Sequence, residues 1–279
     1  MNIFPSDHPM KKRFPWILLF FLTSGAAQGT PWSKIRTPAP GPATAIGSAS
    51  NGCLQGAQAL PARGTGFVSI RRHRNRYYGH PRTLSFIQDL GSAVAQHEGA
   101  SLLVGDLSQP RGGRMSSSHR SHQNGLDVDI WFQLSRHPQR AARRYSESAD
   151  PPSMVRADGR SLSKHWGKAQ RFLLHQAAAD PRVDRIFVNP AIKQALCRSE
   201  QNRRWLHKLR PWWGHDAHFH VRLRCPKNSP DCRRQAPIPK GSGCDASLAW
   251  WFSEEARHPK KGSGKKARPT LPAACRKLH

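Results

Sequence analysis

Hydrophobic positions follow a helical period in one long stretch of the N-terminal half. The apolar residues between 83 and 97 fall on one helical face, which predicts a helix. These residues are Leu84, Phe86, Ile87, Leu90, Val94 and Ala95. A short apolar run at 102–107 follows and is typical of a buried strand. Residues 108–118 are rich in glycine, arginine and serine, so the helix and strand are expected to lead into a loop.

Two other segments alternate between apolar and polar residues, as expected for strands with one buried face. They cover residues 126–132 and 218–225. Side chains alternate across a strand, so each segment presents an apolar face and a polar face. The apolar faces carry Leu126, Val128, Ile130, Phe219, Val221 and Leu223, and the polar faces carry Asp127, Asp129, Trp131, His218, His220 and Arg222. If the strands are neighbours, Asp129 and His220 can share a metal ion.

The remaining pattern predicts a single α+β domain. We expect a helix at 163–178, a strand at 185–188 and a helix at 191–197, which Asn189 caps and which has Pro190 in its first turn. Strands and helices alternate without a regular βαβ rhythm, which favours a central, mainly antiparallel sheet flanked by helices and long loops. We place this domain at 66–256. Residues 28–65 are rich in proline, glycine and alanine without a period, and are expected to be loose.

The N-terminus has the features of a secretory signal peptide. The basic cluster at 11–13 precedes an apolar run at 14–22 and small residues at 24–27. The run is shorter than the roughly 20 residues of a membrane-spanning helix, so a retained anchor is the weaker alternative. We therefore expect residues 1–27 to be cleaved and the mature protein to be periplasmic, without a stable membrane anchor.

An exported chain with an even number of cysteines is expected to form disulfides. Six cysteines lie beyond the predicted cleavage site, at Cys53, Cys197, Cys225, Cys232, Cys244 and Cys275. They favour three disulfides over free thiols, and no Cys-x-x-Cys pair supports a zinc-thiolate site. Six cysteines allow 15 pairings, and their number alone does not determine which one forms. The short gap between Cys225 and Cys232 suits a disulfide that closes a local loop.

The chain is strongly basic, with a formal net charge of +28. No acid follows Glu255, and we expect residues 257–279 to form a basic tail. Such charge attracts polyanions, and for an exported protein these are an anionic cell-wall surface or anionic lipid, with no specific nucleic acid. A non-catalytic, basic wall-binding protein therefore remains an alternative to an enzyme.

Histidine and aspartate spacing predicts a catalytic metal site. His122 lies seven residues before Asp129, and an Asn-Gly turn between them can fold the imidazole back towards the strand. Two imidazoles and one carboxylate give Zn²⁺ three ligands and leave the fourth position for water. A single His-x-His among 15 histidines is usually ordinary. Here His122 and Asp129 are followed by His215, His218 and His220, which makes the metal interpretation more specific.

Two motifs resemble those of the penicillin-insensitive murein endopeptidases, which belong to a wider group with lysostaphin, D-Ala-D-Ala metallopeptidase and hedgehog-type folds. The motifs are SHQNGLDVDI at 121–130 and RPWWGHDAHFHVRLRC at 210–225. Further stretches at 78–81, 104–106 and 185–193 are also similar, and the resemblance extends from Cys53 to Cys275.

The resemblance implies roles for individual residues. His122, Asp129 and His220 would be the zinc ligands, His218 would act in proton transfer, and His215 would also lie in the site. The implied disulfides are Cys53–Cys275, Cys197–Cys244 and Cys225–Cys232. A second metal position would use His119 and Asp158, but Ser161 replaces the histidine expected near Asp158. A second zinc is therefore in doubt, although His165 is close enough in sequence to leave it open.

The resemblance also implies a reaction, hydrolysis of D-alanyl-meso-diaminopimelate cross-links of peptidoglycan. Zinc lowers the pKa of bound water, and His218 or His215 would accept the proton, since the chain has no His-Glu-x-x-His motif. D,D-carboxypeptidase activity is a second enzymatic alternative. Asp127 either orients a ligand histidine or is solvated and inert.

Overall fold

The computed structural model describes residues 31–116, 119–145, 149–258 and 269–279. The predicted signal peptide lies outside these ranges. None of the described helices is both long and apolar enough to cross a membrane.

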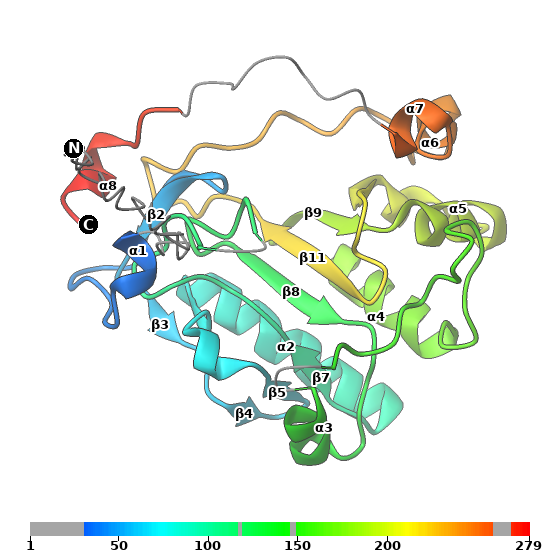
Figure 1. Ribbon diagram of the computed structural model, residues 1–279, viewed down its shortest axis with the longest axis horizontal. Helices are drawn as coiled ribbons and strands as arrows, with labels where there is room; N and C mark the ends of the chain where they lie inside the picture. The colour runs from blue at the N-terminus through cyan, green and yellow to red at the C-terminus, as the bar shows by residue number, and fades with distance from the viewer. Residues whose placement is uncertain (1–30, 117–118, 146–148, 259–268) are drawn as a thin grey trace, which may run out of the picture.

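A seven-stranded sheet forms the centre of the fold, with the strand order β10-β9-β11-β8-β7-β5-β4 (Figure 1). Two neighbouring pairs, β10 with β9 and β7 with β5, are parallel, and the other pairs are antiparallel. This confirms the expected α+β fold with a mainly antiparallel sheet. In the order above, the strands are Leu209–Pro211, Val183–Val188, His218–Leu223, Asp127–Trp131, Leu102–Val104, Phe67–Ser69 and Arg63–Gly64.

Helices α2 (Pro81–Glu98) and α4 (Lys168–Ala179) cover one face of the sheet. They lie side by side behind the sheet in Figure 1, and their apolar stripes join the inward side chains of β8 and β11 in one core cluster. The predicted face assignment is confirmed: Val128, Ile130 and Val221 are completely buried in this core. Burial of apolar surface here stabilises the sheet and leaves the opposite face of β8 and β11 for polar residues.

The remaining helices are shorter. Helix α3 (Pro138–Arg144) contacts β5 and β7, and a second apolar cluster there includes Trp131. Helix α5 (Pro190–Ser199) begins at Asn189, whose side chain accepts a hydrogen bond from the Ala191 amide at 2.9 Å, as predicted. The other helical elements are α1 (Pro31–Lys34), η1 (Arg72–Arg74), η2 (Arg204–Lys208), α6 (Ala246–Trp250), α7 (Glu254–Arg257) and α8 (Ala273–Arg276).

The expectation of a loose segment at 28–65 is wrong for most of its length. Strands β1 (Thr44–Ser48) and β2 (Asn51–Gln55) form an antiparallel hairpin, and β3 (Gln58–Ala59) pairs with β6 (Tyr78–Gly79). The hairpin escaped the sequence pattern because small and glycine residues form much of it, yet Cys53 and Leu54 are completely buried. The folded domain therefore includes residues before the predicted boundary at 66.

The three disulfides pair as the resemblance implies: Cys53–Cys275, Cys197–Cys244 and Cys225–Cys232. The first joins residues 222 apart and attaches α8 to the β1–β2 hairpin, where Trp32 and Ile46 complete a small apolar cluster. The described end of the basic tail, 269–279, is thus anchored to the N-terminal hairpin.

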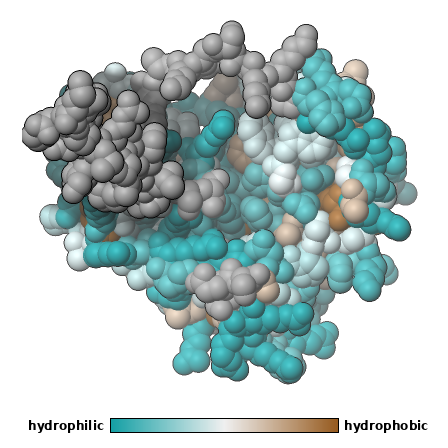
Figure 2. All heavy atoms as spheres, viewed as in Figure 1, coloured by the Kyte–Doolittle hydropathy of each residue, from teal (hydrophilic) through white to brown (hydrophobic). Residues whose placement is uncertain are grey.

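A smaller correction concerns the helix predicted at 163–178, which begins at Lys168. Ser163 belongs to a preceding turn: its amide donates to Met154 O at 2.8 Å and its hydroxyl to Ser153 O at 2.7 Å. These bonds hold the chain outside helical geometry until Gly167. The face shown in Figure 2 is mostly hydrophilic, as expected from the charge.

Candidate metal centre

The polar faces of β8 and β11 meet directly because the strands are antiparallel neighbours. In their register, His220 is the partner of Asp129, and Arg222 is the partner of Asp127. Directly paired residues bring their side chains close together on the same face of a sheet. The sequence prediction that Asp129 and His220 come together is therefore met by the strand register.

The tight loop before β8 positions His122 beside Asp129 and His220. His122 has a φ of +67°, in the left-handed region, and its amide donates to Asp127 Oδ2 at 3.0 Å. The neighbouring Gln123 fastens the loop to the N-terminal hairpin: its amide donates to Ala49 O at 3.0 Å and its side chain to Ser50 O at 2.8 Å. The unusual backbone of His122 is thus held from both sides, as is common for strained residues at functional sites.

Two buried imidazoles converge on one carboxylate oxygen of Asp129. Nε2 of His122 lies 3.4 Å from Asp129 Oδ1, and Nδ1 of His220 lies 3.3 Å from that same oxygen. The imidazole rings of His122 and His220 are 4.5 Å apart. His119 also approaches: one ligand atom each from His119, His122 and Asp129 lie within 4.8 Å of one another. The cluster therefore offers three imidazoles and one carboxylate.

Several buried polar atoms in this cluster lack hydrogen-bond partners among the described residues. They include both ring nitrogens of His122 and Oδ1 of Asp129. His122 is completely buried and Asp129 is only 4% exposed. A buried polar group without a partner costs about 1–3 kcal/mol. A cation between these atoms would remove that cost, so the donor set fits a metal ion.

Electrostatics in the cluster favour an ionised Asp129 beside a neutral His220. Burial would raise the pKa of Asp129, but His122 and His119 hold it well below its usual range. Burial lowers the pKa of His220 to about 4. Burial alone would also lower the pKa of His122, but the Asp129 carboxylate raises it above its ordinary value. At neutral pH, Asp129 and His220 are therefore already in the forms that bind a metal.

Asp127 contacts the cluster through His220 and is completely buried. Arg222 forms a bidentate pair with it, with Nε to Oδ1 at 2.8 Å and Nη2 to Oδ2 at 2.9 Å. Nε2 of His220 lies 3.2 Å from Oδ2 in an ion-pair contact that is not a well-aligned hydrogen bond. The alternative of a solvated, inert Asp127 is wrong. A carboxylate at Nε2 favours the tautomer in which Nδ1 is free to bind a metal.

His218 and His215 lie at the edge of the cluster. Nε2 of His218 is 4.0 Å from Asp129 Oδ1, and its side chain is 26% exposed. The His215 ring lies 5.1 Å from that of His218, and its Nδ1 donates to Trp213 O at 3.0 Å. Burial, followed by the nearby His218, lowers the pKa of His215 to about 4. His215 is therefore neutral at neutral pH and a weaker proton acceptor than an ordinary imidazole.

Asp158 does not join the cluster. It is exposed, and its carboxylate accepts from the amides of Arg160 and Ser161 at 2.8 and 3.0 Å and from the Ser161 hydroxyl. These contacts explain why the predicted pairing of His119 with Asp158 is not formed: the carboxylate caps its own turn, and the metal-compatible group does not include it among the described residues.

Sequence reasoning missed Asp106, which is 5% exposed and contacts His119 Nε2 at 3.0 Å. Arg76 Nη1 donates to the same carboxylate at 3.0 Å. Asp106 follows β7, where the chain leaves the strand after Val104, and alternation within the predicted strand gave no sign of this role. The indication that the sequence did contain was that Asp106 belongs to the stretch 104–106, which is similar to a known family.

Comparisons with known proteins give matches over most of the chain. Residues 45–279 match the family model described as penicillin-insensitive murein endopeptidase. A protein of that name from Yersinia enterocolitica is 43% identical over 271 residues, covering 96% of this chain and 97% of the relative. One from Klebsiella pneumoniae is 43% identical over 274 residues, covering 96% and 98%. Another from Pectobacterium atrosepticum is 44% identical over 260 residues, covering 92% and 91%.

Proposed function

Because the chain belongs to the penicillin-insensitive murein endopeptidase family, we propose that it hydrolyses D-alanyl-meso-diaminopimelate cross-links of peptidoglycan with one bound Zn²⁺. The observation that carries this proposal is the convergence of His122 and His220 on Asp129. The ring nitrogens of His122 and Oδ1 of Asp129 are buried and have no hydrogen-bond partner among the described residues. A periplasmic location follows from this substrate, and the basic surface suits the anionic wall.

His122, Asp129 and His220 are the proposed ligands. His119 competes for this assignment because the metal-compatible group among the described residues consists of His119, His122 and Asp129, without His220. However, Nε2 of His119 lies 3.0 Å from Asp106 Oδ2, so that nitrogen already has a partner. His220 instead has Asp127 at Nε2, which leaves Nδ1 facing Asp129. Asp158 lies in a separate turn, which supports one zinc rather than two.

When bound, Zn²⁺ supplies Lewis acidity, which polarises the scissile carbonyl and lowers the pKa of a water molecule towards neutrality. His218 takes the proton from the attacking water and gives it to the leaving amine nitrogen. Its partial exposure lets it reach both substrate and solvent. The low pKa of His215 supports His218 over His215 in this role, and His215 can instead hydrogen-bond the substrate in its neutral form.

The basic test uses purified protein and cross-linked muropeptide dimers. With zinc present, the dimers should be converted to monomers, because the ligand cluster is complete. After treatment with a chelator the rate should fall to background and should return when zinc is added. Chromatography of the muropeptides measures both. Monomeric pentapeptides in parallel separate endopeptidase from D,D-carboxypeptidase activity, which would release terminal D-alanine. Intact dimers with zinc-replete protein would favour the wall-binding alternative.

The support given by Asp127 leads to a second prediction. Asp127→Asn should weaken zinc binding by about 10- to 100-fold, because the amide no longer fixes the tautomer of His220. The zinc dissociation constant, measured by competition with a chromophoric chelator, reports this loss directly.

Glu200→Gln is the matched control. Glu200 is also buried and also pairs with an arginine, Arg171, but it does not contact the metal cluster. Its zinc affinity should equal that of the wild type. Equal losses in both variants would mean that general destabilisation, and not His220 orientation, explains the effect of Asp127.

A further inference from the structure

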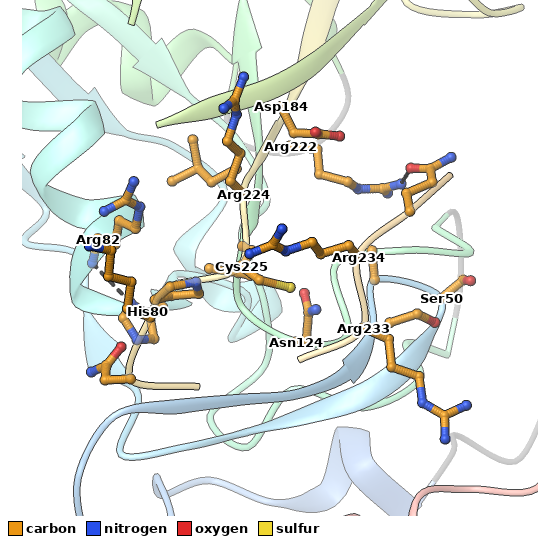
Figure 3. Close-up of a pocket in the computed structure, with 18 of the residues that line it drawn as sticks. Ser50, His80, Arg82, Asn124, Asp184, Arg222, Arg224, Cys225, Arg233 and Arg234 are labelled. Carbon is orange, nitrogen blue, oxygen red and sulfur yellow. Dashed lines mark hydrogen bonds between the residues drawn. The ribbon is translucent and has the colours of Figure 1, made fainter. Parts of the chain in front are cut away.

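A basic cavity of about 920 Å³ lies where β11 ends (Figure 3). Its wall contains six cationic residues, and Asp184 is the one acidic residue among those described as lining it. The cationic residues are Arg82, Arg222, Arg224, Lys227, Arg233 and Arg234. Asp184 is itself paired with Arg185 at 2.7 Å. The cavity therefore presents a strong positive potential, which concave protein walls focus further.

Two arginines are available for a ligand. None of the described acidic residues forms an ion pair with Arg82 or Arg234. In Figure 3, the guanidinium group of Arg234 extends across the cavity towards the start of α2, which carries Arg82, whereas Arg233 extends away. A guanidinium group presents paired donors that match a carboxylate. Two such groups facing one space are suited to a ligand with more than one carboxylate.

The cavity wall also contains a buried acceptor without a partner. Asn124 is 3% exposed, and its Oδ1 has no hydrogen-bond partner among the described residues, while its Nδ2 donates to Gly47 O at 3.3 Å. Figure 3 shows Asn124 beneath the side chain of Arg234. An acceptor in this place suits an amide N–H of the ligand, as a peptide would provide. The donor and acceptor pattern therefore favours an acidic peptide over a simple anion.

The wall is held in place before any ligand arrives. The Cys225–Cys232 disulfide closes the loop that precedes Arg233 and Arg234. This loop is fastened to β1 by two bonds, from the Gly47 amide to Asp231 O at 2.9 Å and from the Arg233 amide to Gly47 O at 3.0 Å. Less conformational freedom is then lost on binding, which raises affinity.

The cavity shares residues with the support of the metal centre. Arg222 lines the cavity and pairs with Asp127, which contacts His220. Asn124 lies two residues after His122. The cavity is therefore connected to the metal cluster through Arg222 and Asp127, while the cluster residues themselves do not line it.

We propose that the cavity is a binding subsite for the free carboxylates of an acidic peptide stem, with Arg82 and Arg234 holding the carboxylates and Asn124 accepting an amide N–H. The identity of this peptide as part of the cross-linked substrate rests on the proposed function. The subsite is distinct from the metal ligands, and it contributes to substrate affinity more than to the chemical step.

The test compares Arg82→Gln/Arg234→Gln with the control Arg140→Gln/Arg198→Gln, which removes the same charge from exposed positions outside the cavity. With muropeptide dimers, the cavity variant should raise KM by about tenfold or more and change kcat less than KM. The control variant should match the wild type. An unchanged KM in the cavity variant, or equal increases in both variants, would overturn the proposal.

A binding measurement separates this proposal from the proposed function. Calorimetry with zinc-loaded protein would use the tripeptide L-Ala-γ-D-Glu-meso-diaminopimelate, which has no scissile D-alanyl bond, and its fully amidated analogue. The acidic tripeptide should bind at least about tenfold more tightly than the analogue, and the cavity variant should lose this preference. Binding without dimer cleavage would support the subsite and contradict the proposed function. Cleavage with no preference for the acidic tripeptide would contradict the subsite alone.

Discussion

His220→Ala is expected to remove bound zinc and to lower kcat for muropeptide dimers by at least about 1,000-fold. The substitution removes Nδ1 of His220, the β11 ligand atom nearest to Asp129. A metal ion supplies several kcal/mol of transition-state stabilisation. A loss of about 4 kcal/mol corresponds to the expected 1,000-fold decrease. Zinc content by atomic absorption and the rate of dimer cleavage measure the two effects. None of the three disulfides involves a residue of β11, so they should preserve the fold, which circular dichroism can verify.

His119→Ala is the matched control for the ligand assignment. It also removes one imidazole from the cluster, but the lost nitrogen already contacts Asp106. Zinc should remain at one ion per molecule in this variant. If His119→Ala loses the metal and His220→Ala keeps it, the ligand set is the group of His119, His122 and Asp129, whose ligand atoms lie within 4.8 Å of one another.

His218→Ala should keep the metal and lose turnover. Its imidazole is 4.0 Å from Asp129 Oδ1 and partly exposed, a position suited to proton transfer but not required for the proposed ligand set. Loss of a general acid–base group typically costs about 10²- to 10⁴-fold. The expected signature is wild-type zinc content together with a kcat lower by that factor.

His215→Ala tests the competing assignment in the same assay. Because burial keeps His215 neutral, its removal should reduce kcat less than His218→Ala does. A near-normal rate for His218→Ala combined with a large loss for His215→Ala would transfer the proton-transfer role to His215.

Alternation along two strands predicted which of their side chains share a face, but not that the two strands are neighbours. Val128 and Val221 fix which faces of β8 and β11 are buried, and strand geometry then places Asp129 and His220 on the other face. Pairing between strands 91 residues apart was an assumption at that stage, because alternation does not determine which strands are neighbours. Only the resemblance connected the two motifs before the structure did.

Hydrophobic periodicity could not predict other features of the structure. The β1–β2 hairpin has too few large apolar residues to show a pattern, and its stability comes from contacts with distant segments such as α8. The role of Asp106 depends on where the chain turns after β7, which is a tertiary property. Asp158 illustrates the reverse error: a motif suggested a ligand, but local hydrogen bonds to Arg160 and Ser161 hold its carboxylate elsewhere.

The link between Cys53 and Cys275 sets an order of events for newly made protein. Cys275 lies four residues from the end of the chain, and the hairpin it clasps carries the carbonyls that hold Gln123, next to His122. Cys53 in the hairpin is made 222 residues before Cys275. The support of the loop that carries His122 is therefore completed only after Cys275 has been made and both thiols have been oxidised to the disulfide. Oxidation thus contributes to the order of the metal cluster although no cysteine belongs to it.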